Sequence, residues 1–268
     1  MTEVTPHDLV VAHYDFPFDL HPYQVEAVNF LAPLPRSGLY LQPGLGKTVV
    51  ATSCALYKRT VGLSEVTLGI MPPMLVAQWA RWLSKVHPKT GVPLRVTRYE
   101  GTPAERRAKS FDADFVLMGI QIFKIDIERI TEEFRDKVVF TFLDEAQCIK
   151  DVGRHNYQRF KAFVDGRMHQ LLTGTPLNSP MDGYAFINLV AQGVYRNLLH
   201  FTDTHVASVD QFDNPKSFQN LDLLEENLLI NSFLRTKEDV LPDLPEAIIT
   251  EIEYELDKKH YALYKTLA

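Results

Sequence analysis

Short apolar runs alternate with segments of helical period along most of the chain. Six runs read as strands, at residues 38–42, 66–71, 94–99, 114–119, 138–143 and 168–174. Between them, residues 48–59, 74–86 and 154–164 carry apolar side chains at spacings of three and four, which predicts amphipathic helices. This alternation is typical of βα units. It predicts an α/β fold with a doubly wound, mainly parallel sheet that is buried on both faces.

The pattern changes after about residue 188. Strand signals stop there, polar and aromatic residues mix as far as residue 213, and residues 221–241 read as helical. We interpret this stretch as a helical protrusion. Beyond it, residues 247–256 alternate, and residues 258–268 follow a helical pattern that is still running at the last residue. The missing stop signal predicts that the sequence was cut from a longer chain.

Composition narrows the class of protein. With 268 residues, 46% of them hydrophobic, the chain can bury one sizeable core, and its net charge of -6 gives no basic excess for nucleic acid. Phosphate contacts depend on local clustering of Lys and Arg, so the total charge does not exclude them. Cys54 and Cys148 are the only cysteines and the nine histidines are scattered, which predicts no disulfide and no zinc site. Without a secretory signal or a long apolar run, we expect a soluble intracellular protein with no membrane partner.

The clearest chemical signal lies at residues 39–51, where a strand runs into a glycine turn and then a helix. Gly44 and Gly46 let the backbone curl so that its N–H groups and the helix start face the β- and γ-phosphates of a nucleotide. Lys47 adds a positive charge for those phosphates, and the Thr48 hydroxyl is suited to bind Mg²⁺. The full pattern has glycine at position 41, where this chain has leucine. The remaining GxGKT core predicts a P-loop with ATP and Mg²⁺ as cofactors.

A second signal is the apolar run that ends in Asp144 and Glu145. Two adjacent carboxylates at the carboxyl end of a parallel strand stand where ligands bind in such sheets. We expect Asp144 to hold Mg²⁺ and Glu145 to orient or deprotonate the attacking water. Such a pair alone is also common in a solvated turn, but the P-loop upstream favours the catalytic interpretation.

A third segment contains Thr173, Gly174 and Thr175, which follow another apolar run. Threonine hydroxyls at a strand end can hydrogen-bond to polar neighbours, so this loop could sense the γ-phosphate site through Gln147. All its residue types also favour plain turns. Taken alone, the segment favours a turn.

Together these segments resemble the Swi/Snf-type branch of the superfamily two helicases, the ATPase motors of chromatin remodellers and their bacterial and viral relatives. Residues 20–31 resemble the Q motif of that family, residues 43–48, 143–147 and 171–180 resemble motifs I, II and III, residues 71–83 resemble motif Ia, and residues 233–245 resemble the stretch that closes the first lobe. The resemblance covers about residues 20–268.

The resemblance implies a RecA-like fold and a division of the chain into four segments. These are an N-terminal lead at 1–19, a RecA-like ATP-binding lobe at 20–193, a helical protrusion at 194–235 inserted after motif III, and a segment at 236–268 that closes the lobe and starts the connection to a second lobe. It also implies that Gln24 reads the adenine edge. The residues expected to bind ATP are Gln24, Gly44, Leu45, Gly46, Lys47, Thr48 and Val49.

Two departures from the family pattern bear on mechanism. Gln147 stands where the family usually has histidine, and a neutral amide can still donate and accept hydrogen bonds toward motif III. Motifs V and VI, with the arginine finger, belong to a second RecA-like lobe, and nothing after motif III here resembles them. Since such a finger is worth about 10³ to 10⁵ in rate, we expect this chain alone to bind ATP and to hydrolyse it poorly.

The expected partner is nucleic acid, and the family resemblance favours duplex DNA as the track. Pro73, Thr102 and Gln121 lie near the family's binding loops and are the candidate contacts. Charges on the helix at 74–86, together with Lys89, more often mark a solvated face. Trp79 and Trp82 are three apart in that amphipathic helix, which favours packing over base stacking.

Two other functional classes stay open. One is a strand-separating helicase of another superfamily two branch, which would need a wedge element. The other is a non-catalytic docking module that uses ATP as a switch, a reading that the acidic net charge favours. A docking module does not need a catalytic acid at Glu145.

Overall fold

The computed structural model describes residues 4–240 and 260–261 of the chain. Contacts divide the chain into two compact units, Met1–Thr236 and Lys237–Ala268. In the described part of the second unit, the helix α12 spans Lys237–Val240. The tail predictions for residues 247–256 and 258–268 fall outside the described residues, apart from His260 and Tyr261.

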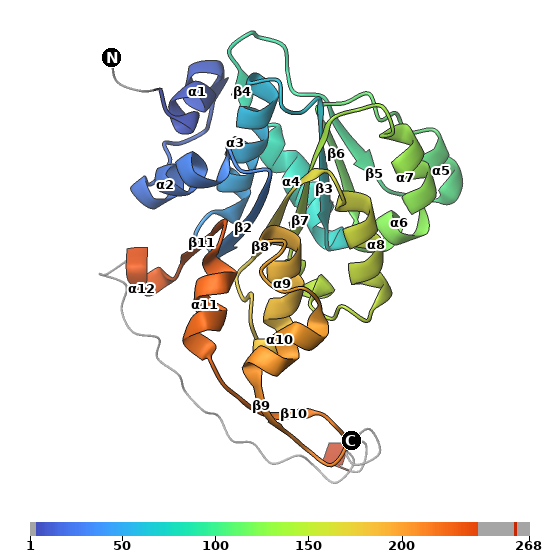
Figure 1. Cartoon of the computed structure of the whole chain (residues 1–268). Coiled ribbons are helices and arrows are strands. Elements are labelled where there is room, and N and C mark those ends of the chain that lie inside the picture. The colour runs from blue at the N-terminus through green and yellow to red at the C-terminus, as the bar shows by residue number, and fades with distance from the viewer. Residues whose placement is uncertain (1–3, 241–259, 262–268) are drawn as a thin grey trace. The chain divides into compact units, whose positions relative to one another are not determined.

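The first unit is an α/β domain in which helices alternate with the strands of one main sheet (Figure 1). Its helices are α1 (Pro6–His13), α2 (Pro22–Leu31), α3 (Lys47–Thr60), α4 (Pro73–Leu83), α5 (Pro103–Arg107), α6 (Ile120–Ile125), α7 (Ile127–Glu133), α8 (His155–Val164), α9 (Gly183–Val190), α10 (Leu198–His205) and α11 (Leu221–Leu229), with 3-10 turns η1 (Ala146–Ile149) and η2 (Pro180–Asp182). Its strands are β1 (Tyr14–Asp15), β2 (Arg36–Leu41), β3 (Val66–Met71), β4 (His87–Pro88), β5 (Val96–Tyr99), β6 (Phe115–Gly119), β7 (Val139–Asp144), β8 (Met168–Thr173), β9 (Val206–Val209), β10 (Pro215–Phe218) and β11 (Ser232–Arg235).

Within the described residues, the main sheet has seven strands in the order β11-β2-β8-β7-β3-β6-β5. Every neighbouring pair is parallel. The six strands and three helices predicted from the sequence are all present, so the doubly wound α/β prediction is confirmed. Because all the strands run the same way, their carboxyl ends meet at one edge of the sheet, and the loops that leave this edge become neighbours.

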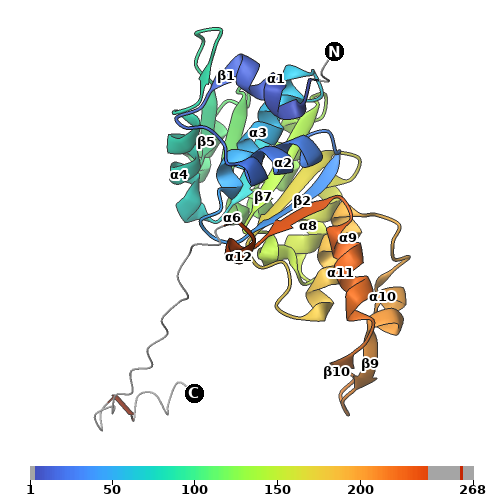
Figure 2. The ribbon, with the colours of Figure 1, turned by 90° about the vertical axis from the view of Figure 1, so that its left-hand side faces the viewer.

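Helices cover both faces of the sheet (Figures 1 and 2). On one face, Phe140 of β7 lies under Lys58 of α3 and Phe142 stacks on Trp79 of α4. On the other face, Tyr40 of β2 packs edge-on against a phenylalanine of α9, within a large apolar cluster that includes side chains of α8 and α11. Successive side chains of a strand point to opposite faces, so near-continuous apolar strands are what two buried faces require.

Helix starts follow local sequence signals. α2 and α4 begin with proline at the first helical position, where the missing N–H costs nothing. Thr102 caps α5 by accepting a hydrogen bond from the Glu105 N–H, and the Glu105 carboxylate accepts one from the Thr102 N–H at 2.7 Å. This reciprocal capping box fixes the direction in which the chain leaves β5.

The segment after residue 193 differs from the all-helical reading. α10 leads into an exposed antiparallel hairpin, β9 with β10, before α11 begins. The helical reading of residues 221–241 is correct for α11 but wrong for residues 232–235, which form β11 and pair in parallel with β2. The chain leaves the helix through Asn231, whose backbone φ is 57°. Pairing with the open edge of β2 overrides the continuous leucine-rich pattern.

No described helix combines the length and the apolar character needed to cross a membrane.

His169 ties β8 to α9 from inside the core. The side chain is 0% exposed, and its Nδ1 and Nε2 lie 3.1 Å from the carbonyl oxygens of Arg167 and Leu189. Burial disfavours the charged ring and lowers the pKa of His169 from 6.5 to about 4.

We predict that this histidine destabilises the fold in mild acid. Between the two pKa values the unfolded state binds more protons than the folded state, so stability falls as pH drops through that window. From about pH 7 to about pH 5 the histidine should account for a loss of about 2 kcal/mol. Urea unfolding at both pH values should show this extra loss for the unsubstituted chain and for the exposed control His155→Gln. An equal loss in His169→Gln would contradict the assignment.

Candidate nucleotide and nucleic-acid site

Three adjacent strands of the sheet end in the segments that the sequence singled out for nucleotide chemistry. β2 leads into the P-loop, β7 ends at Asp144, and β8 ends at Thr173 between them in the sheet. These segments are about 30 to 130 residues apart along the chain. The parallel register brings them to one place.

The P-loop has the backbone that a phosphate cradle needs. Gly44 and Gly46 have φ values of 93° and 83°, in the left-handed region that residues with a side chain rarely adopt. α3 then begins at Lys47, so its free N–H groups face the loop. The Lys47 ammonium donates a hydrogen bond to the Leu41 carbonyl at 3.1 Å. The partner is a neutral carbonyl, so bonds to charged phosphates can replace this contact.

The Q-motif helix α2 lies directly against this loop. Tyr23 and Gln24 both donate to the Leu45 carbonyl, at 3.1 and 3.2 Å. A Cβ on Gly46 would come within 2.4 Å of the Gln24 amide nitrogen, so only glycine leaves this amide its place. Gln24 is 4% exposed, and its other amide atom accepts from the His21 N–H at 2.9 Å. The structure therefore shows Gln24 holding the P-loop, and its reading of adenine stays a prediction.

Asp144 is the buried anion of the site. It is 6% exposed, and its two oxygens accept from the Trp79 indole N–H at 2.8 Å and from the Glu145 backbone N–H at 3.0 Å. Burial raises the pKa of Asp144. In the described part of the chain no lysine or arginine forms an ion pair with it. A buried carboxylate without an ion-pair partner among the described lysines and arginines is an oxygen donor that fits Mg²⁺, and the Thr48 hydroxyl as a second ligand stays a prediction.

Glu145 stands on strained backbone. Its φ of 54° lies in the left-handed region, which a residue with a side chain enters at a cost of about 1 kcal/mol or more. Its carboxylate accepts from the Gln147 amide at 2.7 Å. Strain of this kind gathers at functional sites, where the surrounding structure fixes it.

Gln147 connects the acid pair to motif III. Its amide oxygen accepts from the Thr173 hydroxyl at 2.9 Å, and that hydroxyl accepts from the Thr175 N–H at 3.1 Å. A glutamine in place of the family's histidine thus bridges Glu145 and Thr173 through both halves of its amide. The link exists in the structure, and its role in coupling stays a prediction.

Gly174 brings motif III against the P-loop. A Cβ at this position would lie 2.9 Å from Pro43 Cδ and 3.3 Å from the Leu41 carbonyl oxygen. Only a residue without a side chain permits this approach. Because the two loops are in close contact, a displacement of one loop should displace the other.

The residues expected to contact nucleic acid lie at the other half of the same edge. Pro73, Gln121 and Thr102 follow the adjacent strands β3, β6 and β5, and all three are exposed. Pro73 packs beside the end of β6, since a Cβ on Gly119 would lie 3.1 Å from the proline ring. The sheet therefore gathers these three residues, and their contact with nucleic acid stays a prediction.

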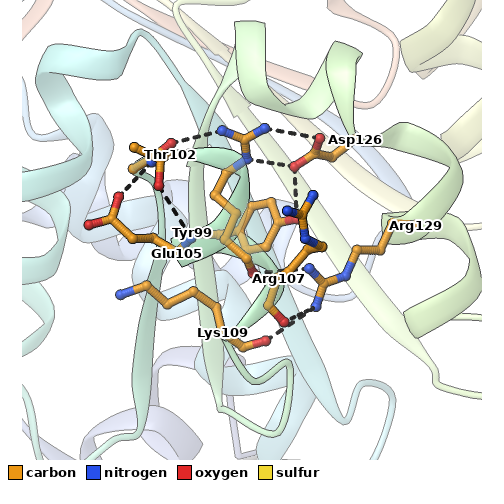
Figure 3. A network of polar contacts seen from close by, with 9 residues as sticks. Tyr99, Thr102, Glu105, Arg107, Lys109, Asp126 and Arg129 are labelled. Atoms are coloured by element: carbon orange, nitrogen blue, oxygen red, sulfur yellow. Dashed lines mark hydrogen bonds and ion pairs between the residues drawn. The ribbon is translucent and has the colours of Figure 1, made fainter.

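A polar network fixes the loop that carries Thr102 (Figure 3). Arg106 is 7% exposed and bonds Asp126 through two nitrogens, at 2.6 and 3.2 Å, which holds the pKa of Asp126 below its usual range. The Tyr99 hydroxyl donates to the same carboxylate at 2.8 Å, and Arg129 donates to three backbone carbonyls of this segment. These arginines are therefore structural, and Arg107 and Lys109 are the exposed cations nearby.

The prediction that Trp79 and Trp82 pack rather than stack on bases agrees with their burial, since Trp79 is 2% exposed and Trp82 is half-buried. What the sequence reasoning missed is the polar end of each ring. A buried indole N–H needs a hydrogen-bond acceptor, so the two tryptophans could have been predicted to bond polar side chains of neighbouring elements. Tyr23 was missed as well, because its contact with the P-loop depends on how α2 folds over it.

The sheet order and the glycine loop define a P-loop lobe of the RecA-like type. The model of the SNF2-related domain matches residues 23–268, and the chain belongs to this family.

Two relatives and one solved structure illustrate the match. The chain is 28% identical over 257 residues to a protein named "Uncharacterized ATP-dependent helicase" from Mycoplasma pneumoniae, over 92% of this chain and 23% of that protein. It is 28% identical over 263 residues to the TATA-binding protein-associated factor mot1 of Schizosaccharomyces pombe, over 87% of this chain and 13% of that protein. The Sulfolobus solfataricus SWI2/SNF2 ATPase core in complex with dsDNA shares the fold, with a TM-score of 0.67 and 22% identity over 94% of this chain and 52% of that one. The chain thus spans less than a quarter of these two relatives.

We predict that Gly174→Ala weakens ATP binding about tenfold, because the new methyl group pushes the P-loop through Pro43. Titration with a fluorescent ATP analogue measures the effect. The matched control is Gly153→Ala, whose methyl group meets only the flexible Asp151 carboxylate, and its affinity should equal that of the unsubstituted chain. Unchanged affinity in Gly174→Ala would show that the two loops move independently.

Proposed function

We propose that this chain is the ATP-binding lobe of a nucleic-acid-dependent motor that translocates on double-stranded DNA. The observation that carries the proposal is the division of one sheet edge into two sets. β2, β8 and β7 end in the predicted nucleotide residues, and β3, β6 and β5 end in the predicted nucleic-acid residues. Relatives named as an ATP-dependent helicase and a chromatin-remodelling ATPase support the ATP part. The fold neighbour whose structure contains dsDNA supports the DNA part.

The nucleotide chemistry is assigned to residues of this chain. Lys47 leaves the Leu41 carbonyl and binds the phosphates that rest on the loop N–H groups. Thr48 and Asp144 would hold Mg²⁺, which would neutralise negative charge on the phosphates when bound. Glu145 orients the attacking water and accepts its proton.

Motif III carries the state of the nucleotide site to the rest of the lobe. Gln147 bonds both Glu145 and Thr173, so a shift of the acid at the γ-phosphate reaches the loop that presses on Pro43. In the parent protein, ATP closes this lobe on a second RecA-like lobe and hydrolysis reopens the pair, which moves it along the track.

The second lobe supplies the arginine finger, so this chain alone binds ATP and turns it over slowly. A strand-separating helicase would use the same lobe together with a wedge elsewhere. A docking module is disfavoured by Glu145, because nothing in mere binding requires a carboxylate on strained backbone at φ 54°.

We predict negligible ATP turnover by the 268-residue chain, with or without duplex DNA, alongside measurable ATP binding. The arginine finger contributes a factor of about 10³ or more, so the rate should lie at least that far below the parent protein's. Steady-state phosphate release measures it, and Lys47→Ala, which should lose ATP binding, identifies contaminating activity. Vigorous turnover that depends on Lys47 would show that the missing cation comes from within this chain or from a second copy of it.

Translocation is tested with the full-length parent protein by displacement of a triplex strand from duplex DNA. We expect displacement with ATP and none with Lys47→Ala. A parent protein that hydrolyses ATP on duplex DNA yet displaces no triplex strand would refute the translocation part alone.

We predict that Gln121→Glu weakens duplex DNA binding by the parent protein about threefold to tenfold, because a carboxylate at the end of β6 repels phosphates. ATP affinity should not change. The control is Gln211→Glu, the same charge change in the exposed turn between β9 and β10. Fluorescence anisotropy of labelled DNA at fixed salt measures both variants. Equal affinities for the two would place the DNA elsewhere.

A further inference from the structure

The indole N–H of Trp79 is directed at the carboxylate that the proposed function assigns to Mg²⁺. Nε1 donates to Asp144 Oδ2 at 2.8 Å, between side chains that are 2% and 6% exposed. The second oxygen of Asp144 accepts from the Glu145 backbone N–H. Each carboxylate oxygen therefore has one donor from the protein and keeps lone pairs for another partner.

Packing fixes the plane of this indole. The ring stacks on Phe142 with centroids 4.4 Å apart, and Phe142 stands two residues before Asp144 on the same face of β7. The Phe142 ring has its place because Gly69 lies opposite it on β3, where a Cβ would come within 2.5 Å of the ring. A stacked, buried indole has little freedom to aim its N–H elsewhere.

Trp82, one turn further along α4, makes a different contact. Its Nε1 donates to the Thr52 hydroxyl at 2.9 Å, and that hydroxyl donates to the Thr48 carbonyl at 2.7 Å. This contact anchors α4 to α3 through a neutral acceptor. The two tryptophans of the chain thus carry the same donor to two unlike partners.

We propose that Trp79 is a positioning residue that holds Asp144 in the orientation for Mg²⁺ binding. It rests on the proposed function, since that function makes Asp144 a magnesium ligand. A second residue that bonds a metal-binding carboxylate tunes affinity for the metal, and its loss costs about 10- to 100-fold. α4 begins at Pro73, beside the end of β6, so the same helix carries a predicted nucleic-acid residue and the indole that bonds the carboxylate.

The test compares nucleotide binding with Mg²⁺ and with EDTA, using the 268-residue chain and a fluorescent ATP analogue. Trp79→Phe keeps a stacking ring and loses the N–H. In this variant, the Mg²⁺ concentration that gives half of the maximal increase in binding of the ATP analogue should rise about tenfold or more. Binding in EDTA should stay near that of the unsubstituted chain, which also shows that the variant folds. Trp82→Phe should behave like the unsubstituted chain in both buffers.

A second measurement needs no folded variant of Trp79. With only two tryptophans, ¹⁵N spectra give two indole signals, which Trp82→Phe assigns. The Trp79 signal should move when Mg²⁺ is added to the nucleotide complex, and the Trp82 signal should not. A normal Mg²⁺ dependence in Trp79→Phe, or a Trp79 signal that ignores Mg²⁺, overturns the inference alone. An unsubstituted chain whose nucleotide binding is the same in Mg²⁺ and EDTA overturns both the inference and the proposed function.

Discussion

The whole arrangement depends on the parallel pairing of the strands of the main sheet. Parallel register places every carboxyl end at one edge, and the order β2-β8-β7 puts motif III between the P-loop and the acid pair. The contacts that join these loops are short and few: the Leu45 carbonyl under α2, the Gln147 amide, and Gly174 against Pro43. Each of these contacts requires the strands to be in this order. The sheet thus brings segments that are far apart in the sequence together into one site.

Helix α4 shows how one amphipathic helix makes two kinds of contact. Its apolar face packs on the sheet, as the spacing of its side chains predicts, while its two indole nitrogens reach a charged and a neutral acceptor. An amphipathic pattern predicts the packing of the helix on the sheet, but it does not predict the hydrogen-bond partners of the indoles. The same holds for the Arg106 and Asp126 pair, which stabilises the loop after β5 and is unavailable for phosphates.

The sequence was sufficient for the elements and for the types of residue at the nucleotide edge. The six predicted strands have strong apolar runs. Gly44 and Gly46 indicate a turn with positive φ from the local sequence alone. It was insufficient for β11, whose four residues continue a leucine-rich helical pattern without a break and become a strand only by pairing with β2. It was equally insufficient for the bond between Trp79 and Asp144, which joins positions 65 residues apart. Such contacts follow from the packing of whole helices, and local patterns do not encode them.

Glu145 has a further consequence for how this chain can vary. At φ 54° a glycine would relax the backbone, so the residue that suits the fold best is one without the carboxylate. Stability and chemistry therefore pull this position in opposite directions. A library of variants screened only for thermal resistance would drift toward glycine at position 145 and would return well-folded lobes without a catalytic acid.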